Sequence, residues 1–150
     1  MSMLNDMSRA NPFEEKLFDF AKQYHSNCKH SDVRELKKYQ EKDIDFIITE
    51  SFGIEAKIDF YPEENFFFEI ISNENINSIG CCFKTKAKYL WYYFVKTNAL
   101  YVIPVENLQN FLRGDVEQYK KKGGDNAIGV VIPIKEFEKH VVITRVGDVI

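Results

Sequence analysis

Two short stretches, residues 44–48 (IDFII) and residues 54–60 (IEAKIDF), decide the fold. Both are rich in isoleucine and phenylalanine. The second alternates apolar and polar residues with a period of two, which is typical of a β-strand. The segment between them, TESFG, contains a glycine and is interpreted as a turn. We therefore expect two strands that are joined by a short turn and pair directly with each other.

Three charged side chains share one face of the second strand. Residues two apart in a strand point the same way, so Glu55, Lys57 and Asp59 are expected to lie together. Direct pairing of the two strands then brings Asp45 beside Glu55. Adjacent carboxylates repel each other and are costly to desolvate, and a divalent cation removes that repulsion. Mg²⁺ prefers such oxygen ligands, and a nearby lysine can assist an attacking water or stabilise a phosphate.

The rest of the chain predicts an order of helices and strands around this pair. The first ten residues are expected to be a loose arm. Asn11 and Pro12 indicate a helix start, Glu14 occupies the position of a capping-box acid, and apolar residues follow at helical spacing. The later elements expected are a short strand or connector over 32–39, a strand over 65–72, a helix over 85–96 whose aromatic residues would also suit a strand, a strand over 99–103, a helix over 105–121, and a last strand, helical turn and strand.

Length, composition and charge are those of one folded domain. The chain has 150 residues, of which 45% are hydrophobic and 29% charged, so a packed core is expected rather than disorder. The net charge of −3 argues against a strongly basic coat but allows a local basic groove. No apolar run approaches the roughly 20 residues that cross a membrane, and the N-terminus lacks an apolar signal segment. We therefore expect a cytoplasmic protein with no membrane partner and with its cysteines as thiols.

Asp45, Glu55 and Lys57 resemble the motif of the PD-(D/E)xK nucleases, in which an acid on one strand is followed by (D/E)xK on its hairpin partner. The family core is a helix, three strands, a helix and a strand, which is the order predicted above for residues 12–104. The resemblance thus implies an α/β fold with a restriction-endonuclease-like mixed sheet, to which residues 105–150 add a helix and strands within one domain. Some phage and bacterial members also share NFxxE and T-K-A-x-Y-L segments, which here are NFFFE, beginning at residue 65, and TKAKYL, beginning at residue 85.

The resemblance implies a Mg²⁺- or Mn²⁺-dependent DNA endonuclease, similar to Holliday-junction resolvases and resident in the cytoplasm, or in a host cytoplasm if the protein is encoded by a phage. By resemblance, Asp45 and Glu55 bind the metal together with the carbonyl of Ala56, Lys57 positions the attacking water, and Glu14 contributes from the first helix. The expected DNA contacts are, by resemblance, Gln40, Lys84 and Lys86 and, by their position just before the first strand, Arg34, Lys37 and Lys38.

Other interpretations of the same residues stay open. In one, Asp45, Glu55 and Lys57 only form cross-strand charge pairs on a solvent-facing hairpin. In another, the nuclease fold has lost its activity and binds a nucleic acid or a host protein. A homodimer is compatible both with a nuclease and with such a binding protein. Residues 25–30, HSNCKH, have metal-ligand side chains but too few of them nearby, so we expect a polar connector. The aromatic run over 89–94 is expected in the core rather than as a base-stacking platform.

Overall fold

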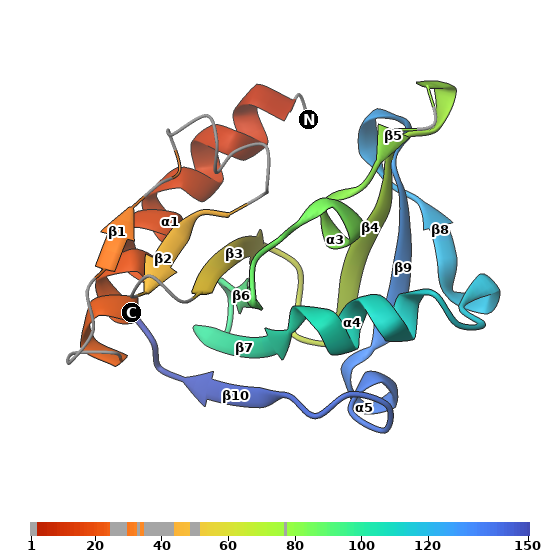
Figure 1. Ribbon diagram of the computed structural model, residues 1–150. Coiled ribbons are helices and arrows are strands. Elements are labelled where there is room, and N and C mark those ends of the chain that lie inside the picture. The colour runs from red at the N-terminus through yellow and green to blue at the C-terminus, as the bar shows by residue number, and fades with distance from the viewer. Residues whose placement is uncertain (1–2, 25–29, 33, 35–43, 49–51, 77) are drawn as a thin grey trace.

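The computed structural model describes residues 3–24, 30–32, 34, 44–48, 52–76 and 78–150. Within these ranges it is a mixed α/β structure with two sheets (Figure 1). One sheet has, in spatial order, β1 (His30–Asp32), β2 (Phe46–Ile48), β3 (Phe52–Asp59), β6 (Tyr89–Phe94), β7 (Ala99–Pro104) and β10 (Thr144–Gly147). The other has, in the same way, β5 (Ser78–Ile79), β4 (Asn65–Asn73), β9 (Ile128–Pro133) and β8 (Lys120–Lys122).

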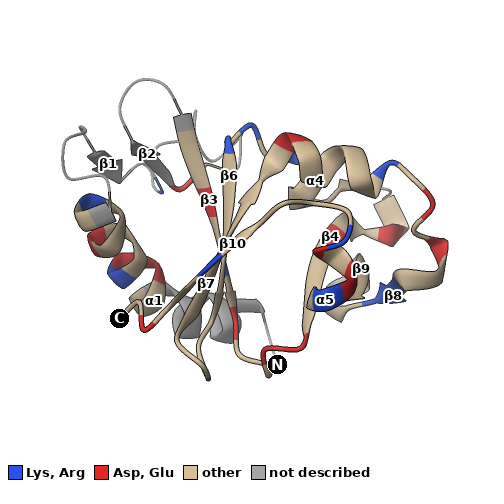
Figure 2. Cartoon of the chain, turned by 90° about the horizontal axis from the view of Figure 1, so that it is seen from below, with Lys and Arg blue, Asp and Glu red and all other residues tan. Residues whose placement is uncertain are grey.

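The helices connect and cover these sheets. They are α1 (Met3–Tyr24), α3 (Cys81–Lys84), α4 (Val105–Leu112) and α5 (Ile134–Phe137), with single turns at η1 (Glu74–Ile76), η2 (Glu117–Tyr119) and η3 (Gly124–Asn126). Figure 2 shows α1 and the four-stranded sheet on opposite sides of β3, β6 and β7. No helix in the described ranges is long and apolar enough to cross a membrane.

The hairpin of β2 and β3 confirms the pairing that the sequence predicts. Phe46 lies opposite Ile54 in an antiparallel register, so Asp45, the preceding residue, stands at the level of Glu55. On its other side β3 pairs with β6 in parallel, with Ile54 opposite Tyr89. The remaining strand pairs of the described residues are antiparallel.

Both faces of the six-stranded sheet are buried at its central strands β6 and β7. On one face, Leu17 and Ala21 of α1 pack against Ile54, Trp91 and Tyr93. The opposite face packs on the four-stranded sheet in a larger cluster, whose members include Phe66, Phe68, Leu90, Tyr92, Phe94, Val130 and Ile132. Strand β3 therefore lies between two cores, and its charged residues must find partners there.

The helix predicted over residues 85–96 is wrong, because residues 89–94 form the strand β6. Trp91 and Tyr93 belong to the core under α1, whereas Leu90 and Tyr92 belong to the core between the sheets. Since both faces are buried, apolar residues occupy successive positions, and such a run does not distinguish a strand from a buried helix. The α-helix described in the crossover from β3 to β6, α3, has only four residues, in place of the longer helix expected.

Three other element predictions need correction. Helix α1 begins at Met3 rather than near Asn11, and Pro12 lies inside it. Proline there costs one backbone hydrogen bond, and the packing of the following apolar residues offsets that loss. Helix α4 ends at Leu112 rather than at residue 121, because Gly114 follows, and Lys120–Lys122 form the edge strand β8. Strand β4 forms as predicted but belongs to the second sheet. The last strand, helical turn and strand are confirmed as β9, α5 and β10.

A glycine sets how closely α3 approaches β4. The Gly80 N–H donates to the carbonyl of Ile70 at 2.9 Å. A Cβ at Gly80 would lie 2.6 Å from the carbonyl oxygen of Glu69. Because this neighbour is backbone, no side-chain rotation relieves the contact.

We predict that Gly80→Ala lowers the free energy of unfolding by about 2 kcal/mol, since β4 and α3 must move apart to admit a methyl group. Urea unfolding followed by circular dichroism measures the effect. Gly124→Ala is the matched control, because a Cβ there meets no atom within 4 Å. It should change the free energy by less than about 0.5 kcal/mol, and equal effects of the two substitutions would contradict the close approach.

Candidate functional site

Asp45 comes directly before β2, at the level of Glu55 on β3. Its N–H donates to the carbonyl of Ile54 at 2.8 Å, and one carboxylate oxygen accepts the N–H of Ala56 at 2.7 Å. The Asp45 and Glu55 side chains are within hydrogen-bonding contact. The two acids that the sequence predicts to be neighbours are therefore neighbours, and Ala56 holds Asp45 through its N–H.

The surroundings of Asp45 disfavour its charged form. Burial, the largest cause, raises the pKa of Asp45 from 3.8 to about 7, and the negative charge of Glu14 acts in the same direction. The hydrogen bond from Ala56, the contact with Glu55 and the positive charge of Arg34 lower the pKa, but by less than burial raises it. A further positive charge beside Asp45 would favour its carboxylate form.

Glu14 and Arg34 complete this side of the site. The Arg34 guanidinium lies 3.5 Å from the Glu14 carboxylate, and their side chains are only 17% and 26% exposed. Glu14, which the sequence predicts to approach from the first helix, raises the pKa of Asp45 through its negative charge. Arg34, which the sequence offers as a phosphate contact, is positioned here against an acid.

Lys57 shares a face of β3 with Glu55, as predicted, and is directed toward the second sheet. Its Nζ atom lies 5.8 Å from the centre of the Phe67 ring on β4. That ring packs closely against Gly129 of β9, since a Cβ at Gly129 would be only 2.3 Å from it. The second sheet therefore supplies an aromatic surface for the lysine, which is a favourable cation–π arrangement.

Asp59, the third charged residue of this face, has a structural role. It is 7% exposed and accepts a hydrogen bond from the Tyr92 hydroxyl. The same hydroxyl accepts the N–H of Phe67 at 3.0 Å, and Asp59 also accepts the N–H of Tyr61 at 2.8 Å. These bonds link the two sheets and satisfy a buried carboxylate, so Glu55 and Lys57 are left as the candidate site residues of this face.

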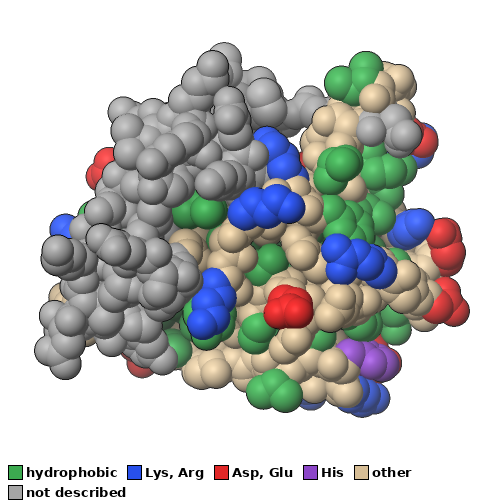
Figure 3. All heavy atoms as spheres, viewed as in Figure 1, with side chains coloured by type: hydrophobic (Ala, Val, Ile, Leu, Met, Phe, Trp, Pro, Cys, Tyr) green, Lys and Arg blue, Asp and Glu red, His purple; other side chains and the backbone are tan. Residues whose placement is uncertain are grey.

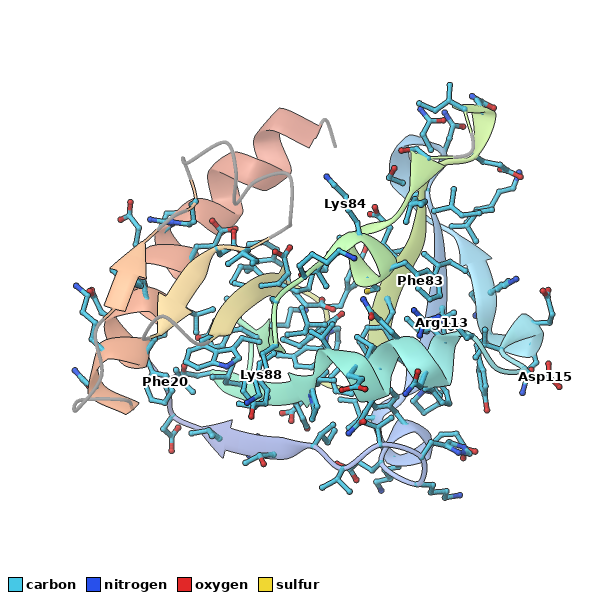
Figure 4. The ribbon with its side chains drawn as sticks, viewed as in Figure 1. Phe20, Phe83, Lys84, Lys88, Arg113 and Asp115 are labelled. Atoms are coloured by element: carbon cyan, nitrogen blue, oxygen red, sulfur yellow. The ribbon has the colours of Figure 1, made fainter. Side chains whose placement is uncertain are left out.

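Helix α3 borders the site. The pKa of the buried Cys82 thiol is raised by its hydrogen bond with Cys81 and by burial, and the charges of Lys57 and Glu55 also act on it. The side-chain amide of Gln109 on α4 donates to the carbonyls of Cys82 at 3.1 Å and Thr85 at 3.3 Å, which holds the end of the helix in place. Lys84 and Lys86, both predicted to contact DNA, are exposed next to it. Figure 4 shows Lys84 extending from α3 into solvent.

The metal expectation rests on two carboxyl groups. In the described part of the chain, no group of three or more His, Cys, Asp or Glu side chains could hold a metal ion. Asp45 and Glu55 nevertheless fit Mg²⁺, because this ion commonly takes one or two carboxylates and keeps several waters. Lys37, Lys38, Gln40 and most of the segment 25–30 fall outside the described residues.

No protein-family model, curated protein or solved structure matches this chain. Its function is therefore inferred from the site itself. Two features of the site were not evident from the sequence, namely the Phe67 ring over which Lys57 lies and the Tyr92 bridge to Asp59. Phe67 occupies an unspecified position of the NFxxE segment, and only the packing of the second sheet brings it to Lys57.

We predict that Asp45→Asn stabilises the protein at neutral pH without divalent cations. The pKa of Asp45 is about 7 when folded, against about 3.9 for an unfolded chain. Because this folded pKa is raised, stability from Asp45 is greatest below about pH 4 and is lost as the pH rises toward 7. The asparagine amide does not ionise, so the stability of the variant relative to the wild type should rise by about 4 kcal/mol between pH 4 and pH 8.

Urea unfolding in EDTA at several pH values between 4 and 8 measures this difference. Asp19→Asn is the control, because the Asp19 side chain on α1 is 72% exposed and its substitution should give a difference that hardly varies with pH. A pH-independent difference for Asp45→Asn would contradict the environment described for that residue.

Proposed function

We propose that the protein is a Mg²⁺- or Mn²⁺-dependent nuclease of the PD-(D/E)xK kind that hydrolyses phosphodiester bonds in DNA. The observation that carries this proposal is the contact between the Asp45 and Glu55 side chains. The Asp45 pKa of about 7 indicates that the positive charge around this carboxyl is too small to offset its burial. Lys57 on the same strand supplies the third residue of the motif. Perturbed carboxyls of this kind are concentrated at functional sites.

The arrangement of elements gives the proposal further support. Helix α1 is followed by β1, β2 and β3 in antiparallel order, and β6 then joins β3 in parallel after the helical turn α3. This is compatible with the family core of a helix, three strands, a helix and a strand. The sequence predicts residues 65–72 as the third strand of that core, but they form β4 of the second sheet, and β1 is the third antiparallel strand instead. The chain also has only four residues in the crossover helix.

The residues of the site divide the proposed chemistry among them. Asp45, Glu55 and the carbonyl of Ala56 would hold the cation, which supplies Lewis-acid chemistry at the phosphate and makes a water easier to deprotonate. The Lys57 ammonium can donate a hydrogen bond to the attacking water or to a phosphate oxygen. Its Nζ atom lies 5.8 Å from the centre of the Phe67 ring. Glu14, paired with Arg34, adds negative charge that favours cation binding from the α1 side.

A binding protein on the same scaffold is the second candidate. The net charge of the chain is −3, which disfavours binding of a polyanion such as DNA. Arg34 pairs with Glu14, so its positive charge is partly neutralised before any phosphate binds. In this case DNA or a host protein would bind without being cleaved. Cleavage assays separate the two candidates directly.

We predict that Asp45→Ala, Glu55→Gln and Lys57→Ala each lower Mg²⁺-dependent cleavage of DNA by about a hundredfold or more, because each removes a group that acts on the reacting phosphate. Plasmid and branched DNA substrates should be tested with Mg²⁺, with Mn²⁺ and with EDTA. Mn²⁺ should also raise the melting temperature of the wild type but not that of Glu55→Gln.

Lys135→Ala and Glu138→Gln are the controls for this set, since both residues lie at α5, away from the β2–β3 hairpin. They should cleave at the wild-type rate. Undiminished cleavage by Asp45→Ala or Glu55→Gln would contradict the proposed site. A wild-type protein that binds DNA and does not cleave it with either cation would favour the second candidate.

A further inference from the structure

Lysines recur at regular intervals where the chain leaves α3. Thr85 has extended backbone, with φ −61° and ψ 137°. Burial then alternates, with Thr85 and Ala87 buried and Lys86 and Lys88 exposed, and Lys84 is exposed at the end of α3. Two residues of extended chain span roughly 6.6 Å, so Lys84 and Lys86, which flank Thr85, are spaced about as far apart as successive phosphates along one nucleic-acid strand.

The backbone beneath these lysines is held at several points. The Lys88 N–H donates to the carbonyl of Gly53 at 3.0 Å, and the Lys88 carbonyl accepts the N–H of Val105 at 2.9 Å. The Gln109 amide binds the carbonyl of Thr85 at 3.3 Å. Because the main chain is already ordered, a ligand of the lysines would lose little affinity to the ordering of this segment.

The segment runs alongside the candidate site. It starts beside Lys57 and Glu55, whose charges act on Cys82 in α3. It ends beside Gly53, one residue before the carbonyl that binds the Asp45 N–H. In Figure 3, basic side chains gather on this face of the molecule, and Figure 4 shows Lys84, Lys88 and Arg113 on it.

An aromatic ring and a guanidinium lie next to the lysines. Arg113, just after α4, places its guanidinium 5.8 Å from the centre of the Phe83 ring. Phe83 is half-buried and packs against the larger core. Between α4 and the lysines there is a depression of about 300 Å³, lined by Thr85, Lys86, Ala87, Lys88, Val105, Glu106 and Gln109.

We propose that this face binds a single strand of nucleic acid. The ammonium groups of Lys84, Lys86 and Lys88 contact successive phosphates, and the Phe83–Arg113 pair provides a surface for stacking a base. The inference rests on the proposed function, because it names a single-stranded or frayed segment as the form of DNA that lies beside Asp45 and Glu55. The exposed Glu106 and the net charge of −3 favour a narrow track of this kind over a surface as broad as a duplex.

Binding of a fluorescein-labelled oligothymidylate to the full chain in EDTA tests the track without cleavage. Fluorescence anisotropy should show affinity falling as salt rises. Lys86→Gln and Lys88→Gln should each weaken binding about fivefold at 0.1 M salt and lower the slope of log K against log salt by about 0.7. Phe83→Ala should weaken binding by about fivefold or more while leaving that slope unchanged. The exposed residues Lys121 and Lys135 provide matched controls as Lys121→Gln and Lys135→Gln, which should bind like the wild type.

The outcomes separate the track from the nuclease. Lysine variants that bind like the controls, or wild-type protein that binds a duplex of the same length more tightly than the single strand, would overturn the track. Asp45→Asn should abolish cleavage and keep oligonucleotide binding. Lysine-dependent binding by a wild type that never cleaves would overturn the nuclease and leave the track standing. Cleavage that depends on Asp45, together with undiminished binding by the lysine variants, would support the nuclease and overturn the track.

Discussion

The parallel pairing of β3 with β6 is the interaction on which the rest of the structure depends. Parallel strands cannot be joined by a tight turn, so the chain must leave the sheet after Asp59 and return before Tyr89. The excursion contains β4, η1, β5 and α3, and it begins the second sheet, to which β9 and β8 are added from the C-terminal part. The second core thus follows from one strand pairing, and the hydrogen bond from Lys88 to Gly53 marks where the chain returns.

The charged residues on and beside β3 differ in how the surrounding structure compensates their burial. Asp59 lies inside the second core and is satisfied by the Tyr92 hydroxyl and by backbone N–H groups. Lys57 lies over the Phe67 ring, toward the edge of that core. Asp45, opposite Glu55, is the residue whose local bonds do not offset its burial, as its pKa of about 7 indicates. The contrast between a carboxyl that its hydrogen bonds satisfy and one whose burial outweighs its hydrogen bonds is the physical reason to propose a functional role for Asp45 rather than for Asp59.

Period-two alternation was sufficient to predict β3 and the adjacency of Asp45 and Glu55, because one face of that strand is charged. It was insufficient for β6, where two buried faces remove the alternation. A strand pattern also does not specify a partner, so the sheet to which β4 belongs could not be predicted. The contact of Lys57 with Phe67 depends on that choice of sheet and on the close approach of Gly129, and it could be found only in the folded chain.

The crossover also places the lysines of the proposed track apart from the acidic residues of the candidate site. Acidic Glu14, Asp45 and Glu55 lie together on the hairpin and α1, whereas the lysines of residues 84–88 lie along the returning chain. A phosphate held by the lysines would therefore be repelled from the carboxyls, and more strongly because the site is partly buried. A divalent cation between them would reverse the sign of that interaction. On this account the lysines supply affinity for the strand without a metal, whereas close approach of its phosphate to Asp45 and Glu55 requires one.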